Sequence, residues 1–171
     1  MARFYGLEPF SLTESRVKTK LYAAVLPIAG ICFAAPVVLA QTEVIIATPS
    51  DLKWSDVTSL PVGAKIAVIE GKMNEEGPIT AQIKLPADYR VPAHWHPGVE
   101  RVTVLSGTFN YGMGDSFDLK KTRALGPGSV VVMQPKMNHF VWTKDETVFQ
   151  LNVMGPWRIN YVNPADDPRK K

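Results

Sequence analysis

Cysteine is nearly absent from this sequence, since Cys32 is the only one among 171 residues. A single thiol excludes an internal disulfide and a metal site built from several thiolates. The residue before it, Ile31, is larger than the small residue that a lipid-attachment site needs. The chain must therefore fold around an apolar core, and any metal ion would be held by nitrogen and oxygen ligands.

A surplus of charge of one sign is also missing. The formal net charge is +3, of which residues 1–40 carry +2 and residues 41–171 only +1. A nearly neutral domain without a basic stripe is a poor partner for nucleic acid. The terminal sequence Arg169-Lys170-Lys171 is expected to be a solvated tail. With 46% hydrophobic and 20% charged residues, the composition is typical of one soluble domain.

Long apolar runs are absent except at Leu21–Ala40, which follows a basic stretch ending at Lys20. The run closes with Val38-Leu39-Ala40, which places small residues where signal peptidase cleaves. Residues 1–40 are therefore predicted to be a signal peptide, and Gln41 to be the new N-terminus. Cleavage would leave a periplasmic or secreted protein without a stable membrane anchor.

Twenty uncharged residues could instead remain as a membrane-spanning anchor. Pro27, Gly30 and Pro36 interrupt the run, which favours cleavage over anchoring. No Arg-Arg pair precedes the run, so a signal for export of the folded protein is not expected.

Long helical patterns are lacking too, and the remaining chain consists of short β-rich runs bounded by turn residues. This spacing predicts an all-β domain at residues 41–171, with a closed or sandwiched antiparallel sheet and a core at about 60–155. Residues 41–60 are expected to be an arm or edge strand, and 163–169 a loosely held tail. The predicted strands are 64–70, 79–85, 91–96, 100–105, 108–113, 129–133, 139–143 and 147–154.

The sequence has only three histidines, and all of them suit one metal site. Alternation along a strand puts His94 and His96 on the same face. Glu100 follows after a Pro-Gly turn, and His139 lies further along the chain. Three imidazoles and a carboxylate predict a divalent transition metal ion as cofactor, with Fe, Mn, Ni, Cu and Zn all suitable.

The spacing of these ligands resembles the cupin superfamily. His94, His96, Glu100 and Gly107 fit the first cupin motif, and a second motif runs from Gly128 to its histidine, His139. In particular, the chain resembles small, exported, single-domain bacterial cupins. The resemblance covers roughly residues 60–155 and implies a single cupin barrel, that is, a jelly roll or double-stranded β-helix.

Four positions depart from the cupin pattern, although every ligand is kept. Asp88 stands in place of the leading glycine of the first motif. In the second motif, Gln134 replaces a proline, Lys136 a glycine and Thr143 an asparagine. These departures concern the geometry of the turns near the site.

Periodicity also predicts which residues line the cavity. If His139 faces inward, so do Val141 and Thr143, and Phe140 and Trp142 face away. If Glu100 faces inward, Val102 and Val104 follow. On the last strand, either Gln150 and Asn152 or Phe149, Leu151 and Val153 point in, and the sequence leaves both open. A mostly apolar wall around a metal suits a small organic substrate or ligand.

Tyr111 is the candidate catalytic residue, because it precedes the Gly112–Asp115 loop and could supply an acid at the barrel mouth. The alternative is a hairpin turn with a packed aromatic. Trp54 and Trp157 are expected to be core or rim aromatics.

Two classes of function fit this pattern. As an enzyme, the protein would act on a small organic substrate at the metal. The cupin resemblance implies a dioxygenase, an isomerase or a lyase, and a dioxygenase is favoured because a His/carboxylate set suits redox metals. As a binding module, it would hold a metal or small molecule as a sensor without turnover. A homodimer is one candidate assembly.

The predicted cleavage can be tested on protein purified from its native host. Mass spectrometry is expected to find a mature chain that begins near Gln41. An intact N-terminus in the membrane fraction would replace export with anchoring.

Overall fold

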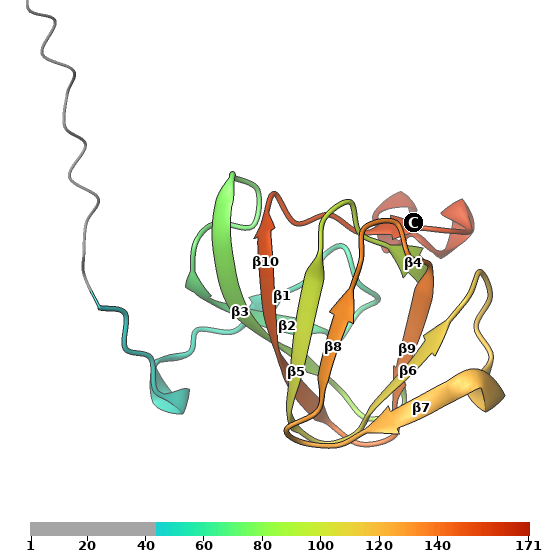
Figure 1. The fold of residues 1–171 in the computed structure, drawn as a ribbon, viewed down its shortest axis with the longest axis horizontal. Helices are drawn as coiled ribbons and strands as arrows, with labels where there is room; N and C mark the ends of the chain where they lie inside the picture. The colour runs from blue at the N-terminus through green and yellow to red at the C-terminus, as the bar shows by residue number, and fades with distance from the viewer. Residues whose placement is uncertain (1–43) are drawn as a thin grey trace, which may run out of the picture. The chain divides into compact units, whose positions relative to one another are not determined.

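The computed structural model describes residues 44–171, which form the domain considered below (Figure 1). The predicted signal peptide, residues 1–40, lies outside the described residues, as does the alternative of an anchor. Among the described residues, no helix is both long and apolar enough to cross a membrane.

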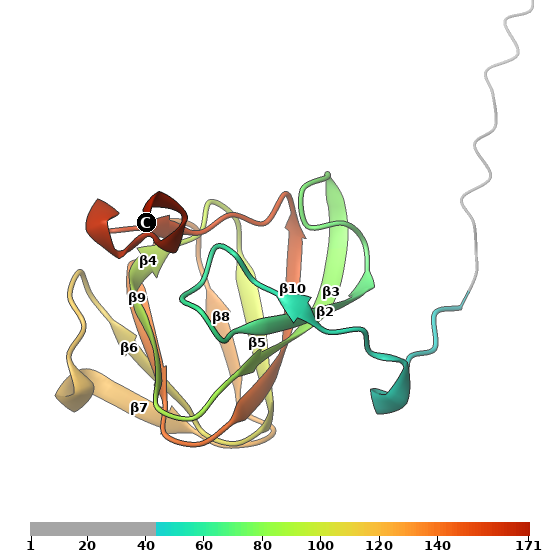
Figure 2. The same ribbon diagram turned by 180° about the vertical axis from the view of Figure 1, so that it is seen from behind.

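Residues 44–171 form eleven strands in two antiparallel sheets. One sheet has the order β1-β2-β3-β10-β5-β8, and the other has the order β11-β4-β9-β6-β7 (Figures 1 and 2). This confirms the predicted all-β jelly roll. The strands are β1 (Ser55–Asp56), β2 (Lys65–Glu70), β3 (Gly77–Leu85), β4 (Tyr89–Trp95), β5 (Glu100–Ser106), β6 (Phe109–Met113), β7 (Thr122–Leu125), β8 (Val130–Met133), β9 (His139–Thr143), β10 (Thr147–Gly155) and β11 (Asn160–Tyr161).

Short 3₁₀ helices complete these elements. They are η1 (Pro49–Asp51), η2 (Leu119–Lys121), η3 (Pro164–Asp166) and η4 (Pro168–Lys170).

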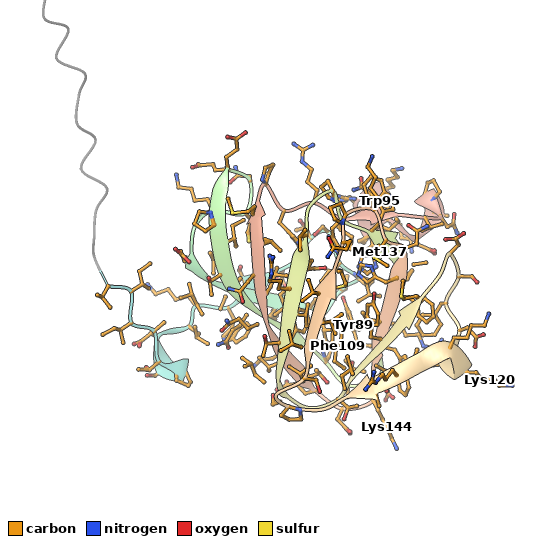
Figure 3. The ribbon with its side chains drawn as sticks, in the orientation of Figure 1. Tyr89, Trp95, Phe109, Lys120, Met137 and Lys144 are labelled. Carbon is orange, nitrogen blue, oxygen red and sulfur yellow. The ribbon has the colours of Figure 1, made fainter. Side chains whose placement is uncertain are left out.

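The core lies between the sheets and follows the period of two along each strand. Figure 3 shows Tyr89 and Phe109 in the interior, whereas Lys120 and Lys144 project outward. On β3, every second residue from Ile79 to Leu85 is buried. This apolar face is the main source of stability, because burial contributes about 25 cal/mol per Å² of apolar surface.

The structure settles the orientation of the last long strand, β10. Phe149, Leu151 and Val153 are buried in the core. Asn152 lies on the opposite face, where its amide donates to the Thr80 hydroxyl at 3.0 Å. The apolar alternative left open by the sequence is therefore the correct one.

Both ends of the domain are more firmly held than the sequence indicates. The core extends beyond residues 60–155, since Val57, Ile159 and Tyr161 are buried. The expectation of a loose tail at 163–169 is wrong. Asp167 pairs with Arg169, whose guanidinium also donates to the Ile159 carbonyl at 3.0 Å. The terminal basic sequence is thus in part a structural contact.

Two turns keep a glycine-like backbone without glycine. Asp88 has a φ of 54° and Lys136 a φ of 63°, at the positions where the cupin pattern has glycine. The Lys136 amide donates to the His96 carbonyl at 2.8 Å, so this turn lies against the end of the histidine strand. Left-handed backbone at a residue with a Cβ costs about 1–2 kcal/mol. Asp88 and Lys136 therefore keep the backbone conformation of the glycine turns, at a cost in backbone strain.

Gly107 shows why another motif glycine is retained. Its φ is +75°, and a Cβ there would lie 2.4 Å from the Glu146 carbonyl oxygen and 2.8 Å from the Cα of Thr147. Any larger residue would push the turn between β5 and β6 away from the start of β10.

The strain at Lys136 predicts a stabilising substitution. Lys136→Gly should raise the free energy of unfolding by about 1 kcal/mol, because glycine adopts this φ without a Cβ clash. Lys136→Ala is the matched control, since it removes the exposed side chain and keeps the strain. Urea denaturation at neutral pH measures both. A glycine variant no more stable than the alanine variant would contradict the expectation.

Candidate metal centre

The two sheets bring the predicted ligands together at one end of the barrel. His94 on β4 is the cross-strand partner of His139 on β9, and His96 follows directly after β4. Glu100 begins β5 in the other sheet. Figure 3 labels Trp95 and Met137, chain neighbours of these histidines, at this end of the molecule. The three histidines and Glu100 are each at most 5% exposed.

The three imidazoles converge as the sequence predicts. One ring nitrogen from each of His94, His96 and His139 lies within 4.8 Å of the others. The ring centroids are 4.2 Å apart for His94 and His139 and 5.1 Å apart for His94 and His96. Three nitrogens at this spacing can share one ion.

A backbone carbonyl fixes the tautomer of each histidine. A carbonyl oxygen can only accept, so an Nδ1 in contact with one must carry a proton. Nε2 is then left free to bind a metal, which is the usual arrangement around metal-ligating histidines. The contacts join His94 to the Pro92 carbonyl at 2.7 Å, His96 to the Arg158 carbonyl at 2.8 Å and His139 to the Met137 carbonyl at 3.0 Å.

Glu100 supplies the carboxylate beside this group. Its Oε2 lies 3.0 Å from Nε2 of His96. In the neutral tautomer fixed above, both atoms are acceptors, and two buried acceptors at this distance require a positive charge between them. A proton or a metal ion meets that requirement. This set of side chains therefore fits a divalent transition metal ion. The three histidines are the residues whose nitrogens lie close enough together to share it.

The three histidines differ in the direction in which the site shifts their pKa values. Burial, reinforced by His139 and His96, holds the pKa of His94 well below its ordinary value. Burial also lowers the pKa of His139. Burial would lower the pKa of His96 as well, but the Glu100 carboxylate raises it above the ordinary value. Burial would raise the pKa of Glu100, and His96 instead holds it low. His94 and His139 are thus neutral at pH 7, which is the form that binds a metal ion.

A cavity of about 30 Å³ adjoins the ligands. Val102 and Val141 line it, in agreement with the predicted inward faces of β5 and β9. Phe149 and Ile159 add further apolar wall. The predicted outward residue Phe140 packs instead against Phe117, with ring centroids 5.3 Å apart.

Tyr111 lies beside the ligands without lining this cavity. It is paired with Val141 across β6 and β9, and its ring centroid is 5.6 Å from that of His139. Burial and the charge of Glu100 raise the pKa of its phenol. Its proximity to the site is established, and a role as acid stays a prediction.

Trp157 contacts the site in a way that the sequence does not indicate. Its indole N–H donates to Oε1 of Glu100 at 3.2 Å, and its ring stacks on His96 at 5.5 Å between centroids. Arg158, the next residue, provides the carbonyl for His96. No spacing rule connects residues 57 or 62 positions away from their partners, so only the fold reveals these contacts. Trp157 is more than a rim aromatic.

The lowered histidine pKa values predict a loss of stability in acid. For His94 and His139, the folded pKa lies below the unfolded value of about 6.5, so the unfolded state binds more protons as the pH falls. His96 acts oppositely, because its raised pKa stabilises the fold below about 6.5. Because the pKa of His94 is held well below its ordinary value and His139 acts in the same direction, metal-free protein should lose stability between pH 6.5 and pH 5.

Urea midpoints of chelator-treated protein at pH 7 and pH 5 measure this loss. His94→Asn removes the most strongly affected ring and should show a smaller acid loss than the unmodified protein. An equal loss in the variant would assign the acid response to other groups.

No curated protein matches the sequence. Solved structures, however, agree with this architecture. The polyketide cyclase RemF from Streptomyces resistomycificus has a similar structure, with a TM-score of 0.63 and 15% identity over 75% of this chain and 92% of that chain.

Two further structures are similar. One is a conserved protein with a double-stranded β-helix domain from Klebsiella pneumoniae, with a TM-score of 0.54 and 16% identity over 72% of this chain and 97% of that chain. The other is an RmlC-like cupin from Shewanella frigidimarina, with a TM-score of 0.51 and 12% identity over 66% of this chain and 91% of that chain. At such identities, the likeness shows the fold alone.

The family model is more specific. The model described as the ChrR Cupin-like domain matches residues 42–151, which is more than half of the chain. The chain therefore belongs to the ChrR cupin-like family of the cupin superfamily.

Proposed function

We propose that this protein is a metal-dependent enzyme that acts on a small organic substrate outside the cytoplasm. His94, His96, His139 and Glu100 would hold a divalent transition metal ion. The observation that carries the proposal is the set of three carbonyl-anchored Nδ1–H groups, which leaves three Nε2 atoms free. The Nε2 of His96 lies 3.0 Å from the Glu100 carboxylate. The predicted signal peptide supports a periplasmic or secreted location.

When bound, the ion would supply redox or Lewis-acid chemistry. The protein residues provide the environment for it. Glu100 offsets part of the positive charge, and the indole N–H of Trp157 fixes one of its oxygens. Val102, Val141 and Phe149 make the cavity apolar, which strengthens electrostatic interactions inside it.

Oxygenase-type chemistry is the favoured class. Besides the four ligands, the cavity is lined by apolar and aromatic side chains, with no further carboxylate, lysine or histidine among them. Isomerisation and elimination usually require a separate acid or base to move a proton. Tyr111 is the one candidate nearby, and it does not line the cavity, so an isomerase or lyase ranks second.

A metal-dependent sensor without turnover is the second candidate function. The observation that favours it is the size of the inner cavity, about 30 Å³, against about 300–1,000 Å³ for ordinary ligand pockets. A cavity of this size has room for a water molecule or a diatomic gas beside the ion.

Metal content and turnover test the proposal. His96→Ala and His139→Ala should each lower metal affinity by at least about tenfold, because even residues that only orient metal ligands contribute that much. Trp54→Ala is the control, since Trp54 packs against Lys84 at 4.7 Å and contributes nothing to the site. Atomic absorption on equal amounts of folded protein measures the metal.

Oxygen consumption with a panel of small organic acids and phenols then measures turnover by the metal-loaded protein. Unchanged metal content in both histidine variants would falsify the site. Full metal content without oxygen consumption or product would favour the sensor.

A further inference from the structure

The inner cavity has a volume of about 30 Å³, and a larger groove lies beside it. The groove has a volume of about 320 Å³, which falls within the usual range of small-molecule sites. Trp157 lines both the inner cavity and the groove. A molecule in the groove would therefore contact the same side chain that contacts Glu100 and His96.

The segment Pro156–Arg158 forms the wall between groove and ligands. On the ligand side, Trp157 donates to Glu100 at 3.2 Å, and the Arg158 carbonyl accepts from Nδ1 of His96 at 2.8 Å. On the groove side, all three residues of the segment are in the lining. A displacement of this wall would move both the carboxylate and the imidazole.

The groove combines apolar surface with one unpaired cation. Met73, Pro156 and Trp157 supply the apolar part. Within residues 44–171, no carboxylate lies within salt-bridge distance of the exposed Arg158. The only acidic residue of the groove, Asp56, pairs with Lys65 at 2.7 Å.

This charge balance selects the ligand class. A guanidinium binds a carboxylate through two parallel hydrogen bonds, and one positive charge matches one negative charge. Thr58 and Ser59 also line the groove, and their hydroxyls are the kind of donor that the same anion needs. A phosphate, with nearly two charges, would be poorly neutralised by a single arginine.

We propose that this groove binds a small organic carboxylate, with its charge on Arg158 and its apolar body against Trp157 and Met73. Occupancy is transmitted to the metal centre through Trp157. The coupling rests on the proposed metal function, whereas binding in the groove does not require the ion.

Benzoate and its neutral analogue benzamide test the groove by isothermal titration of metal-free protein. Benzoate should bind, and benzamide should bind about tenfold more weakly or worse, because it lacks the charge-assisted hydrogen bonds. Arg158→Gln should weaken benzoate to a similar degree. This variant leaves the backbone carbonyl for His96 in place. Arg101→Gln, on an exposed arginine of β5 outside the groove, is the matched control and should not change affinity.

The coupling is tested by the visible absorption of the cobalt(II)-loaded protein. Benzoate should change the spectrum of the unmodified protein. Trp157→Phe keeps an aromatic surface but lacks the N–H donor, so it should still bind benzoate while the spectral change shrinks.

Four results would overturn the proposal. They are no binding of benzoate to metal-free protein, equal affinity in Arg158→Gln, displacement of benzoate by equimolar inorganic phosphate, and an undiminished spectral change in Trp157→Phe. Failure of the protein to bind cobalt would instead contradict the metal function, and benzoate binding would then still support the groove.

Discussion

The candidate metal centre depends on three hydrogen bonds from histidine Nδ1 atoms to backbone carbonyls. They leave His94, His96 and His139 with one free ring nitrogen each, and a ring nitrogen from each of the three lies within 4.8 Å of the others. Two of the carbonyls come from residues two positions earlier in the chain, Pro92 and Met137. The local backbone that builds each site strand thus also fixes its imidazole. Side-chain rotation would otherwise scatter these nitrogens, at a loss of metal affinity.

The third carbonyl has a different origin and a different consequence. Arg158 lies 62 residues from His96, in the segment that follows β10. The same segment places Trp157 on Glu100. His94 and His139 are therefore positioned by local backbone, whereas His96 and Glu100 contact a distant segment that also lines the outer groove. His96 and Glu100 are therefore the two predicted metal ligands that the proposed occupant of the groove would affect.

Much of the fold and the ligand positions could be predicted from the sequence, because alternation and spacing are local rules. Ring nitrogens of His94 and His96 converge as the alternation predicts, and β9 spans His139–Thr143 as expected. The orientation of β10 could not be derived, since both faces of the strand are chemically acceptable until the second sheet is placed. Trp157 was missed because its partners are distant in the chain. The ordered tail could not be predicted, because polar composition does not reveal the pairing of Asp167 with Arg169.

The turns illustrate a further limit of motif reasoning. Asp88 and Lys136 stand where the cupin motifs have glycine. From the sequence alone, a different backbone conformation would be expected in both turns. Instead, the backbone keeps positive φ at both residues. The Lys136 amide bonds to the His96 carbonyl, and the Asp88 amide to the Lys144 carbonyl at 3.2 Å. The surrounding sheet therefore imposes the conformation, and the strain is borne by the fold as a whole.

The central claim is that the three imidazoles present Nε2 to a metal while Nδ1 stays protonated on a carbonyl. Long-range proton–nitrogen correlation NMR of the zinc-loaded protein observes this directly, because protonated and metal-bound ring nitrogens have distinct chemical shifts. The account predicts a protonated Nδ1 and a metal-bound Nε2 in His94, His96 and His139. A protonated Nε2 in any of the three would contradict it.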